Sequence, residues 1–109
     1  MKGIYEKIFE TGIIPVVVID DPDDALPIAK ALYDGGLPAA EITFRTPAAA
    51  ESIRRIAHEF GDKILVGAGT VLNEEQAESA IGAGAKFVVS PGFSEPVVKY
   101  CLSRGVTVI

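Results

Sequence analysis

A glutamate and an arginine stand four residues apart in one short apolar stretch, AEITFRTP. If this stretch forms a strand, alternate side chains share a face, so its polar and apolar side chains point to opposite sides. The polar set is Glu41, Thr43 and Arg45, and the apolar set is Ile42 and Phe44. The Cα atoms of Glu41 and Arg45 then lie about 13 Å apart, too far for a simple direct ion pair.

Two interpretations of this polar face remain open. In the first, the face looks into the interior of a barrel of parallel strands, with Arg45 at the mouth and Glu41 deeper. Partial desolvation there would raise the pKa of Glu41 toward a value useful for proton transfer. In the second, the face is structural, so that a buried partner satisfies Glu41 and water solvates Arg45 at the strand end.

The segment GAGT ends another apolar run and places the hydroxyl of Thr70 at the carboxyl end of a strand. Its glycines either let a substrate approach the backbone or allow tight packing of the strand against a helix. The third glycine of a Rossmann motif and the Gly-Lys-Ser/Thr of a phosphate loop are missing, which disfavours a nucleotide site. The segment SPG, residues 90–92, forms either a further loop at the site or a plain turn.

The other chemically capable residues favour structural roles. His58 lies off the apolar stripe of its helix and is interpreted as a surface residue, and Cys101 is interpreted as core. Helix capping and the helix dipole explain a cluster of aspartates better than a metal site does. The cluster is Asp20, Asp21, Asp23 and Asp24. No spacing of His, Cys and carboxylates suggests zinc, and we expect no metal.

Five β-branched runs alternate with helical patterns along the chain, which predicts βαβ units and a parallel sheet. The runs cover residues 13–20, 39–45, 63–70, 86–92 and 106–109. Helices are expected at residues 2–11, from Asp23 or Asp24 to Gly35–Gly36, after Thr46–Pro47, from Asn73 to Gly82 or Gly84, and from Ser94 to Gly105. Asn73 and Gln76 should form a capping box.

Two α/β folds accommodate this order of elements. Four βα units and a fifth strand make about half of a TIM (β/α)₈ barrel, which takes about 250 residues in full. A doubly wound sheet of five strands is the competing fold, and its size suits 109 residues. Right-handed crossovers are common to both folds and do not separate them.

Composition restricts the class of partner. The net charge is −5, with no basic run, which argues against nucleic acid and anionic membranes. No apolar stretch approaches the roughly 18 residues that a membrane span needs. The chain carries a single cysteine, which fits a reducing compartment. We therefore expect a cytoplasmic protein that binds neither nucleic acid nor membrane.

A resemblance to one enzyme family covers nearly the whole chain. It rests on DDALPIAKAL, GGLPAAEITFRTPAAAESI, VGAGTVL, GAKFVVSPG and VVKYCL. These segments closely resemble those of the KDPG/KHG aldolases, which act on 2-keto-3-deoxy-6-phosphogluconate (KDPG) and 4-hydroxy-2-oxoglutarate (KHG). The resemblance implies a (β/α)₈ barrel of which residues 1–109 form a single incomplete domain, cut before the sixth strand and usually assembled as a homotrimer.

The resemblance also implies an activity and roles for three residues. The activity is class I aldol cleavage of KDPG to pyruvate and glyceraldehyde 3-phosphate in the Entner–Doudoroff route, through a lysine Schiff base and without metal or cofactor. By position, Glu41 matches the general acid/base, and Arg45 and Thr70 match residues that hold the pyruvyl carboxylate of the 2-keto acid. We therefore expect these three side chains to converge on one cavity at the carboxyl ends of parallel strands.

The lysines depart from the family pattern. They are Lys2, Lys7, Lys30, Lys63, Lys86 and Lys99, and none falls at the carboxyl end of an expected strand. The family's Schiff-base lysine lies on the sixth strand, and its phosphate loops follow later strands. Two hypotheses follow: the chain is the N-terminal half of an aldolase, or it is a non-catalytic half-barrel that associates through its open sheet edges. In either case, we expect residues 1–109 alone to be inactive.

Overall fold

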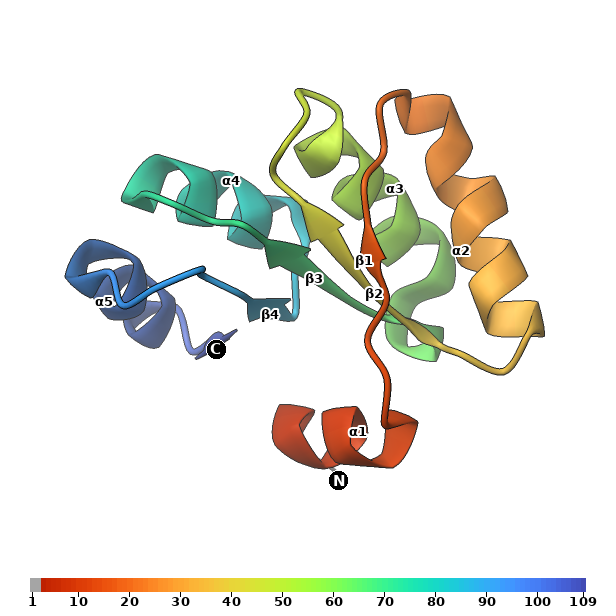
Figure 1. The fold of residues 1–109 in the computed structure, drawn as a ribbon, viewed down its shortest axis with the longest axis horizontal. Helices are drawn as coiled ribbons and strands as arrows, with labels where there is room; N and C mark the ends of the chain where they lie inside the picture. The colour runs from red at the N-terminus through yellow and green to blue at the C-terminus, as the bar shows by residue number, and fades with distance from the viewer. Residues whose placement is uncertain (1–2) are drawn as a thin grey trace.

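The computed structural model describes residues 3–109 as one parallel sheet whose strands alternate with helices (Figure 1). The elements are α1 (Ile4–Thr11), β1 (Val16–Val17), the short 3₁₀ helix η1 (Pro22–Asp24), α2 (Ala25–Asp34), β2 (Ala39–Thr43), α3 (Ala49–Phe60), the 3₁₀ helix η2 (Gly61–Lys63), β3 (Leu65–Gly69), α4 (Glu74–Ala83), β4 (Phe87–Val88), α5 (Glu95–Ser103) and β5 (Thr107–Val108). Every expected strand and helix is present. Met1 and Lys2, the second of which belongs to the helix expected at residues 2–11, lie outside the described residues.

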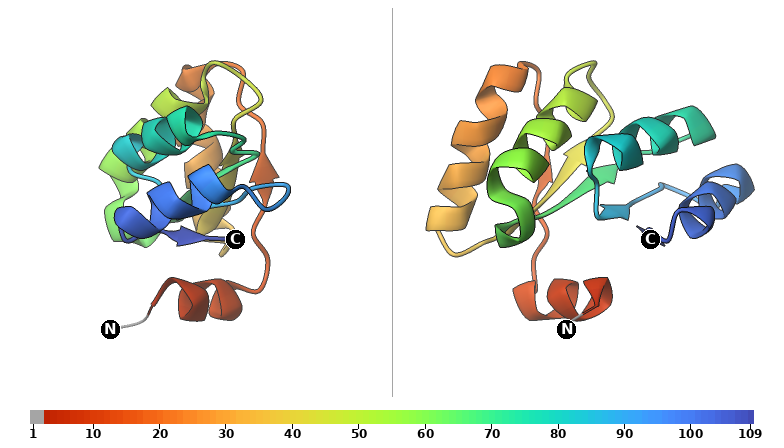
Figure 2. Two further views of the ribbon diagram at one scale, coloured as in Figure 1. Left: turned by 90° about the vertical axis from the view of Figure 1, so that its left-hand side faces the viewer. Right: turned by 180° about the vertical axis from the view of Figure 1, so that it is seen from behind.

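The order of the strands decides between the two candidate folds. The strands follow one another as β1-β2-β3-β4-β5, and each pairs with the next in parallel. A doubly wound sheet reverses its strand order at a switch point, with helices on both faces. Here α2, α3, α4 and α5 contact one another in sequence and lie on one side of the sheet (Figure 2). The fold is therefore the first half of a TIM barrel, and the doubly wound alternative is wrong.

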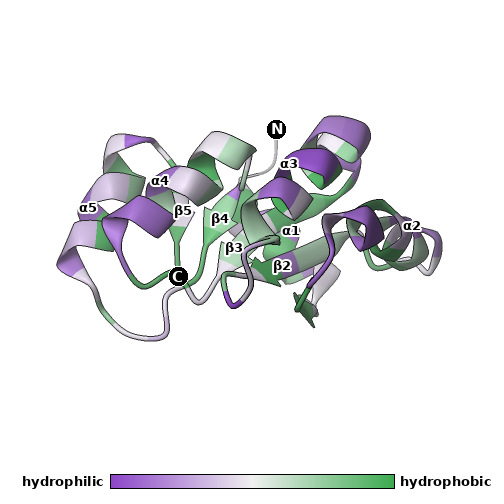
Figure 3. Ribbon diagram, turned by 90° about the horizontal axis from the view of Figure 1, so that it is seen from above, coloured by the Kyte–Doolittle hydropathy of each residue, from purple (hydrophilic) through white to green (hydrophobic). Residues whose placement is uncertain are grey.

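The helices and the outer face of the sheet enclose the main hydrophobic core. On β2 and β3 this face carries Ala40, Ile42, Val66 and Ala68, all at most 1% exposed. The residues that α3 adds to the same core include Ile53 and Ile56, as its apolar stripe requires. Figure 3 shows the strands as mostly hydrophobic and the hydrophilic residues concentrated on the helices.

The inner face of the sheet is covered only at its base. A second cluster there joins Ala39, Leu65 and Phe87, and Ile4 and Ile8 of α1 pack against it. Helix α1 therefore lies across the amino ends of the strands (Figure 1). No helix between residues 3 and 109 combines the length and the hydrophobicity that crossing a bilayer requires.

The helix starts follow the expected caps with two corrections. Asn73 accepts a hydrogen bond from the Gln76 N–H at 2.8 Å, but the Gln76 side chain accepts from the N–H of Leu72 instead of that of Asn73. The expected start of α2 is confirmed, because Asp24 occupies its N-cap position, but the Asp24 side chain makes no cap hydrogen bond. Asp21 instead accepts from the Asp23 N–H and starts η1 just before α2. The acidic stretch of residues 20–24, which contains four aspartates and Pro22, thus forms a short 3₁₀ turn before the α-helix begins.

Strands β1, β4 and β5 are shorter than expected. The run at 13–20 forms a ladder with β2 only at Val16 and Val17. Single backbone bonds extend the pairing further, such as Glu41 N–H to the Pro15 carbonyl at 2.9 Å and Val89 N–H to the Ala68 carbonyl at 2.8 Å. β-propensity marks where the chain is extended, whereas a ladder also needs a partner in register.

Candidate functional site

Glu41 lies in the middle of β2, on the face that the outer helices leave uncovered. Its neighbour Ile42 belongs to the core beneath those helices, so alternation places Glu41 on the opposite side. The Glu41 carboxylate leans forward over Gly69 of the adjacent strand. A Cβ atom added at Gly69 would stand 2.0 Å from Oε2 of Glu41. The strand therefore needs a glycine at position 69 for this carboxylate to lie where it does.

The first glycine of GAGT, Gly67, makes room for an aromatic ring. A Cβ atom at Gly67 would come within 2.4 Å of the Phe87 ring, which is 1% exposed at the base of the inner face. Val66 and Ala68, between and beside these glycines, face the helices instead. The proposed strand-to-helix packing is therefore the wrong explanation of Gly67 and Gly69. Sequence analysis missed Phe87 because only the register of β3 and β4 brings it opposite Gly67.

The electrostatics of Glu41 combine burial with one nearby charge. Burial raises the pKa of Glu41 above its usual value, and the positive charge of Arg45 opposes this shift without cancelling it. Arg45 itself is exposed, just beyond the end of β2. Among residues 3–109, no cation forms a salt bridge with Glu41, so the structural interpretation finds no ion-pair partner in this part of the chain.

Thr70 follows β3 in a strained backbone conformation. Its φ angle is +54°, and Thr70 is the one residue other than glycine with a positive φ in the described part of the chain. A β-branched residue rarely occupies this left-handed region, and such strain concentrates at functional sites. Thr70 directly follows Gly69, against which the Glu41 carboxylate lies. The sequence carries no signal of this strain.

Hydrogen bonds join the loops at the carboxyl ends of neighbouring strands. The Thr46 hydroxyl donates to the Ile19 carbonyl at 2.5 Å and thereby links the loops after β1 and β2. The Ser90 hydroxyl donates to the Val71 carbonyl at 3.0 Å and links the SPG loop to the end of GAGT. These bonds hold the loops around Arg45 and Thr70 in fixed relation to one another.

The convergence of Glu41, Arg45 and Thr70 on one cavity stays a prediction, because two of the hollows between residues 3 and 109 lie elsewhere. A hollow of about 480 Å³ lies between α4 and α5, and another of about 360 Å³ lies at the base near α1. Neither is lined by any of the three residues. The inner face is open around Glu41, which is partly exposed next to the exposed side chains of Val16 and Val18. The surface that carries Glu41 is therefore only partly enclosed by residues 3–109.

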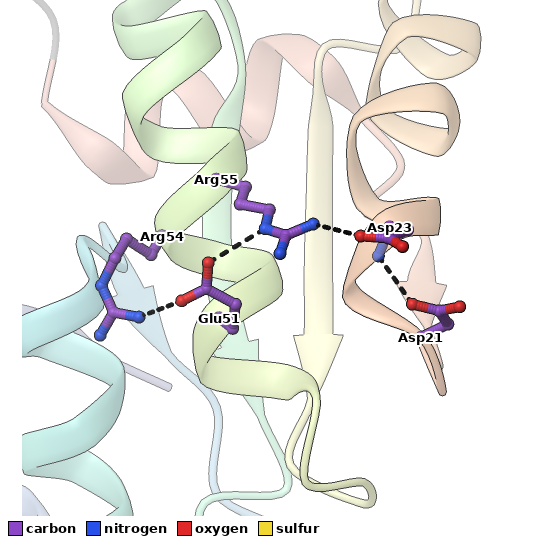
Figure 4. Close-up of polar contacts among 5 residues, drawn as sticks. All are labelled: Asp21, Asp23, Glu51, Arg54 and Arg55. Carbon is purple, nitrogen blue, oxygen red and sulfur yellow. Dashed lines mark hydrogen bonds and ion pairs between the residues drawn. The ribbon is translucent and has the colours of Figure 1, made fainter.

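Two of the four aspartates after β1, Asp21 and Asp23, make structural contacts, as Figure 4 shows. Asp23 pairs with Arg55 of α3 at 2.8 Å, and Arg55 also donates to Glu51 at 3.0 Å. The hydrogen bond to Asp23 is the main reason that the pKa of Arg55 is raised, and the bond from Arg55 is the main reason that the pKa of Glu51 is lowered. All these groups are at least one-third exposed, so water weakens the pairs.

Two further residues with expected structural roles are Cys101 and His58. Cys101 is fully buried, and burial raises the pKa of its thiol, so its assignment to the core is confirmed. His58 is exposed on α3, which confirms the surface assignment. Between residues 3 and 109, no three His, Cys, Asp or Glu side chains gather closely enough to hold a metal ion.

The lysines of the described residues lie away from the inner face at the strand ends. Lys30 pairs with Asp34 on α2, and Lys99 pairs with Glu95 at 2.7 Å on α5. Lys7 and Lys63 line a hollow at the base of the molecule. Lys86 precedes β4 at the same end of the sheet. Lys2 lies outside the described residues.

Comparisons with known proteins give one consistent answer. A family model described as KDPG and KHG aldolase matches residues 4–109. A 2-dehydro-3-deoxy-phosphogluconate aldolase of Treponema pallidum is 51% identical over 109 residues, which is 100% of this chain and 51% of that protein. A KHG/KDPG aldolase of Escherichia coli is 47% identical over 99 residues, which is 90% of this chain and 46% of that protein.

A solved structure agrees with these sequence matches. It is the KDPG aldolase of Legionella pneumophila, with pyruvate captured as a covalent carbinolamine intermediate. Its TM-score is 0.82 at 38% sequence identity, over 88% of this chain and 46% of that chain. The present chain thus spans about half the length of the relatives that it matches.

Proposed function

This chain belongs to the KDPG and KHG aldolase family, and we propose that it supplies the N-terminal half of the active site of a class I aldolase. The reaction is cleavage of KDPG to pyruvate and glyceraldehyde 3-phosphate, with 4-hydroxy-2-oxoglutarate as a further substrate. The observation that carries the proposal is the half-buried Glu41 carboxyl, with its raised pKa, on the uncovered face of the sheet beside Arg45. A carboxyl group in such surroundings is suited to move protons near neutral pH.

Each residue has one task in this reaction. A lysine amine from outside residues 1–109 attacks the keto carbon C2, and loss of water from the carbinolamine gives a Schiff base. Loss of the C4 hydroxyl proton then breaks the bond between C3 and C4 and releases glyceraldehyde 3-phosphate, which leaves an enamine. The enamine takes up a proton at C3 to become the pyruvate Schiff base, and water hydrolyses this to pyruvate and the free lysine. Glu41 shuttles protons at the carbinolamine and enamine steps. Arg45 offers its planar donor fork to the pyruvyl carboxylate, and Thr70 offers its hydroxyl.

The strained backbone of Thr70 supports its part in this proposal. Holding a β-branched residue at a positive φ costs about 1–3 kcal/mol, so a site gains nothing from it unless the side chain must point in one direction. Thr70 lies next to the glycine that accommodates the Glu41 carboxylate, within reach of the same small substrate. We further propose a cytoplasmic homotrimer for the complete enzyme, in line with the family resemblance and the net charge of −5.

A second candidate function is a non-catalytic half-barrel that associates through its open edge and inner face. The observation in its favour is at β1 and directly after it, where Val16 is 58% and Val18 is 48% exposed. One edge of β1 pairs with no strand among residues 3–109. Such edges promote pairing with another chain.

Borohydride trapping with pyruvate separates the two candidates. In the full-length enzyme that carries this chain, borohydride should reduce the pyruvyl Schiff base and leave a stable adduct on a lysine outside residues 1–109. Residues 1–109 alone should give no adduct and should sediment as dimers or larger species. An adduct with turnover on any of the six lysines of this chain would overturn the proposal, namely on Lys2, Lys7, Lys30, Lys63, Lys86 or Lys99. So would a full-length protein without KDPG cleavage, which would favour the second candidate.

A further inference from the structure

Thr43 is a buried hydroxyl that lacks a hydrogen-bond partner. Its side chain is fully buried at the end of β2, and its Oγ1 atom finds no donor or acceptor among residues 3–109. Most buried polar side chains in native proteins have a partner, so an unpaired one calls for an explanation. None of the roles assigned above uses Thr43.

Thr43 lies level with the Glu41 carboxylate on the same face of the sheet. It is two residues beyond Glu41 on one strand, and its partner in register on β3 is Gly69. The Glu41 carboxylate has leaned forward to lie over that glycine, 2.0 Å from the position of its missing Cβ. Because neighbouring strands are about 4.8 Å apart, the carboxylate has come to the side of the Thr43 side chain.

We propose that the Thr43 hydroxyl donates a hydrogen bond to the ionised Glu41 carboxylate once the inner face is closed, which makes Thr43 a positioning residue for proton transfer. This inference rests on the proposed function of Glu41. In the half-enclosure described here, Glu41 is still partly exposed and water can solvate it. Closing the barrel removes that water, and a rotation of either side chain then pairs the orphaned hydroxyl with the carboxylate.

Few other groups can control the protonation of Glu41. Arg45 is the charged residue that acts on it, from beyond the end of β2. The inner positions of β1, its continuation and β3 carry side chains that do not titrate, namely Val16, Val18, Gly67 and Gly69. Phe87 of β4, next to Gly67, does not titrate either. A hydrogen bond to the charged form of an acid lowers its pKa. Thr43 would therefore lower the pKa of Glu41 at short range and so oppose the effect of burial, as Arg45 does at longer range. It would also hold the Glu41 oxygens in one orientation.

Ser52 provides the matched control. It is the other buried hydroxyl without a partner among the described residues, but it lies on α3 in the helical layer. A general effect of removing an unpaired buried hydroxyl should appear at both positions. An effect on Glu41 should appear at Thr43 alone.

The test uses the full-length enzyme that carries this chain and compares Thr43→Val, Thr43→Ser and Ser52→Ala with the parent. Carbon-13 NMR of labelled glutamate, assigned with Glu41→Gln, gives the titration of Glu41 directly. We expect Thr43→Val to raise the Glu41 midpoint by about 0.5–1 pH unit. The acid limb of pyruvate proton exchange should move with it, and the KM for pyruvate should stay within about twofold. Thr43→Ser should restore the parental midpoint, and Ser52→Ala should leave it unchanged.

The inference fails if the Glu41 midpoint in Thr43→Val equals the parental value, or if Thr43→Ser shifts it as much as Thr43→Val does. Thr43→Ala, which adds no atoms, carries the same expectation should Thr43→Val disturb folding. An enzyme without aldolase activity would sink the proposed function, whereas the titration of Glu41 would still decide the role of Thr43.

Discussion

The two faces of the sheet are formed by the same strands but carry side chains of different kinds. On β3, Val66 and Ala68 point outward into a core that the helices close completely. On the same strand, Gly67 and Gly69 point inward and leave their space to Phe87 and the Glu41 carboxylate. The outer face is continuous and apolar, and the inner face combines small residues, a carboxylate and an unpaired hydroxyl.

The outer face mainly stabilises the fold, whereas the inner face carries the residues proposed for catalysis. The outer face removes large apolar side chains from water, which is the main favourable contribution to folding. The inner face buries a carboxyl group and a hydroxyl at a cost and strains the backbone at Thr70, as active sites often do.

The largest effect is expected from Glu41→Gln on the inner face. In the full-length enzyme it should slow pyruvate proton exchange by about 10²–10⁴-fold, because it removes a proton carrier. Pyruvate binding, measured by calorimetry, should change little. Arg45→Ala should do the reverse and weaken binding by about 10–100-fold, because it removes a charged hydrogen bond to the carboxylate. Equal effects of both changes on binding would refute the assignment of roles.

Truncation of the outer core should cost the most stability. Ile53 of α3 is fully buried against the sheet, so Ile53→Ala should lower the free energy of unfolding by about 2–5 kcal/mol in urea titrations. Val16→Ala on the exposed part of β1 should change it by less than about 0.5 kcal/mol in the isolated chain. A similar loss in both variants would show that the inner face is covered in solution.

The two inward glycines should respond differently to alanine. Gly67→Ala forces a Cβ atom against the packed Phe87 ring and should cost about 1–3 kcal/mol of stability, with activity affected only through folding. Gly69→Ala meets the flexible end of Glu41, so stability should hold while proton exchange falls at least about tenfold as the carboxylate is displaced.

Gly82 gives the control for these glycine variants. It lies on α4 with open space around its Cα hydrogen, so Gly82→Ala should stabilise the protein by about 0.5–1 kcal/mol. Loss of stability in Gly69→Ala as large as in Gly67→Ala would mean that Glu41 is not free to move.

The smallest effect concerns stability against pH. The folded-state pKa of Glu41 lies above its unfolded-state value, so ionisation of this group destabilises the fold. The cost is absent below about pH 4 and grows as the pH rises through the ordinary and then the raised pKa. The glutamine in Glu41→Gln cannot ionise. The variant should therefore have the same thermal midpoint as the parent at low pH and a higher one at pH 7.

Glu51 should show the opposite sign on the outer surface. Hydrogen bonds from Arg55 and Arg54 lower the pKa of Glu51, so its ionised form stabilises the fold above the ordinary pKa. That contribution is lost as the pH falls through the lowered pKa, and Glu51→Gln should be slightly less stable than the parent at pH 7 only. Thermal melting curves of Glu41→Gln and Glu51→Gln at pH 4 and pH 7 test both predictions. If both substitutions shifted the thermal midpoint at pH 7 in the same direction, the burial of Glu41 would be contradicted.

Sequence patterns a few residues long determined the helices and strands and the side of β2 on which Glu41 lies. Period-two alternation placed Glu41, Thr43 and Arg45 on one side of a strand before any fold was known. Cap residues marked the helix starts to within a turn, as Asn73 shows. These features could be predicted because they depend on residues a few positions apart.

Only the tertiary structure decided how the strands are ordered and what meets across them. The register that sets Gly69 beside Thr43 and Gly67 beside Phe87 depends on the packing of a whole helical layer, which no local pattern reports. The same holds for the positive φ of Thr70 and the unpaired hydroxyl of Thr43. Side chains from different strands meet through non-local pairing, and the sequence of one strand carries no record of its neighbour's register.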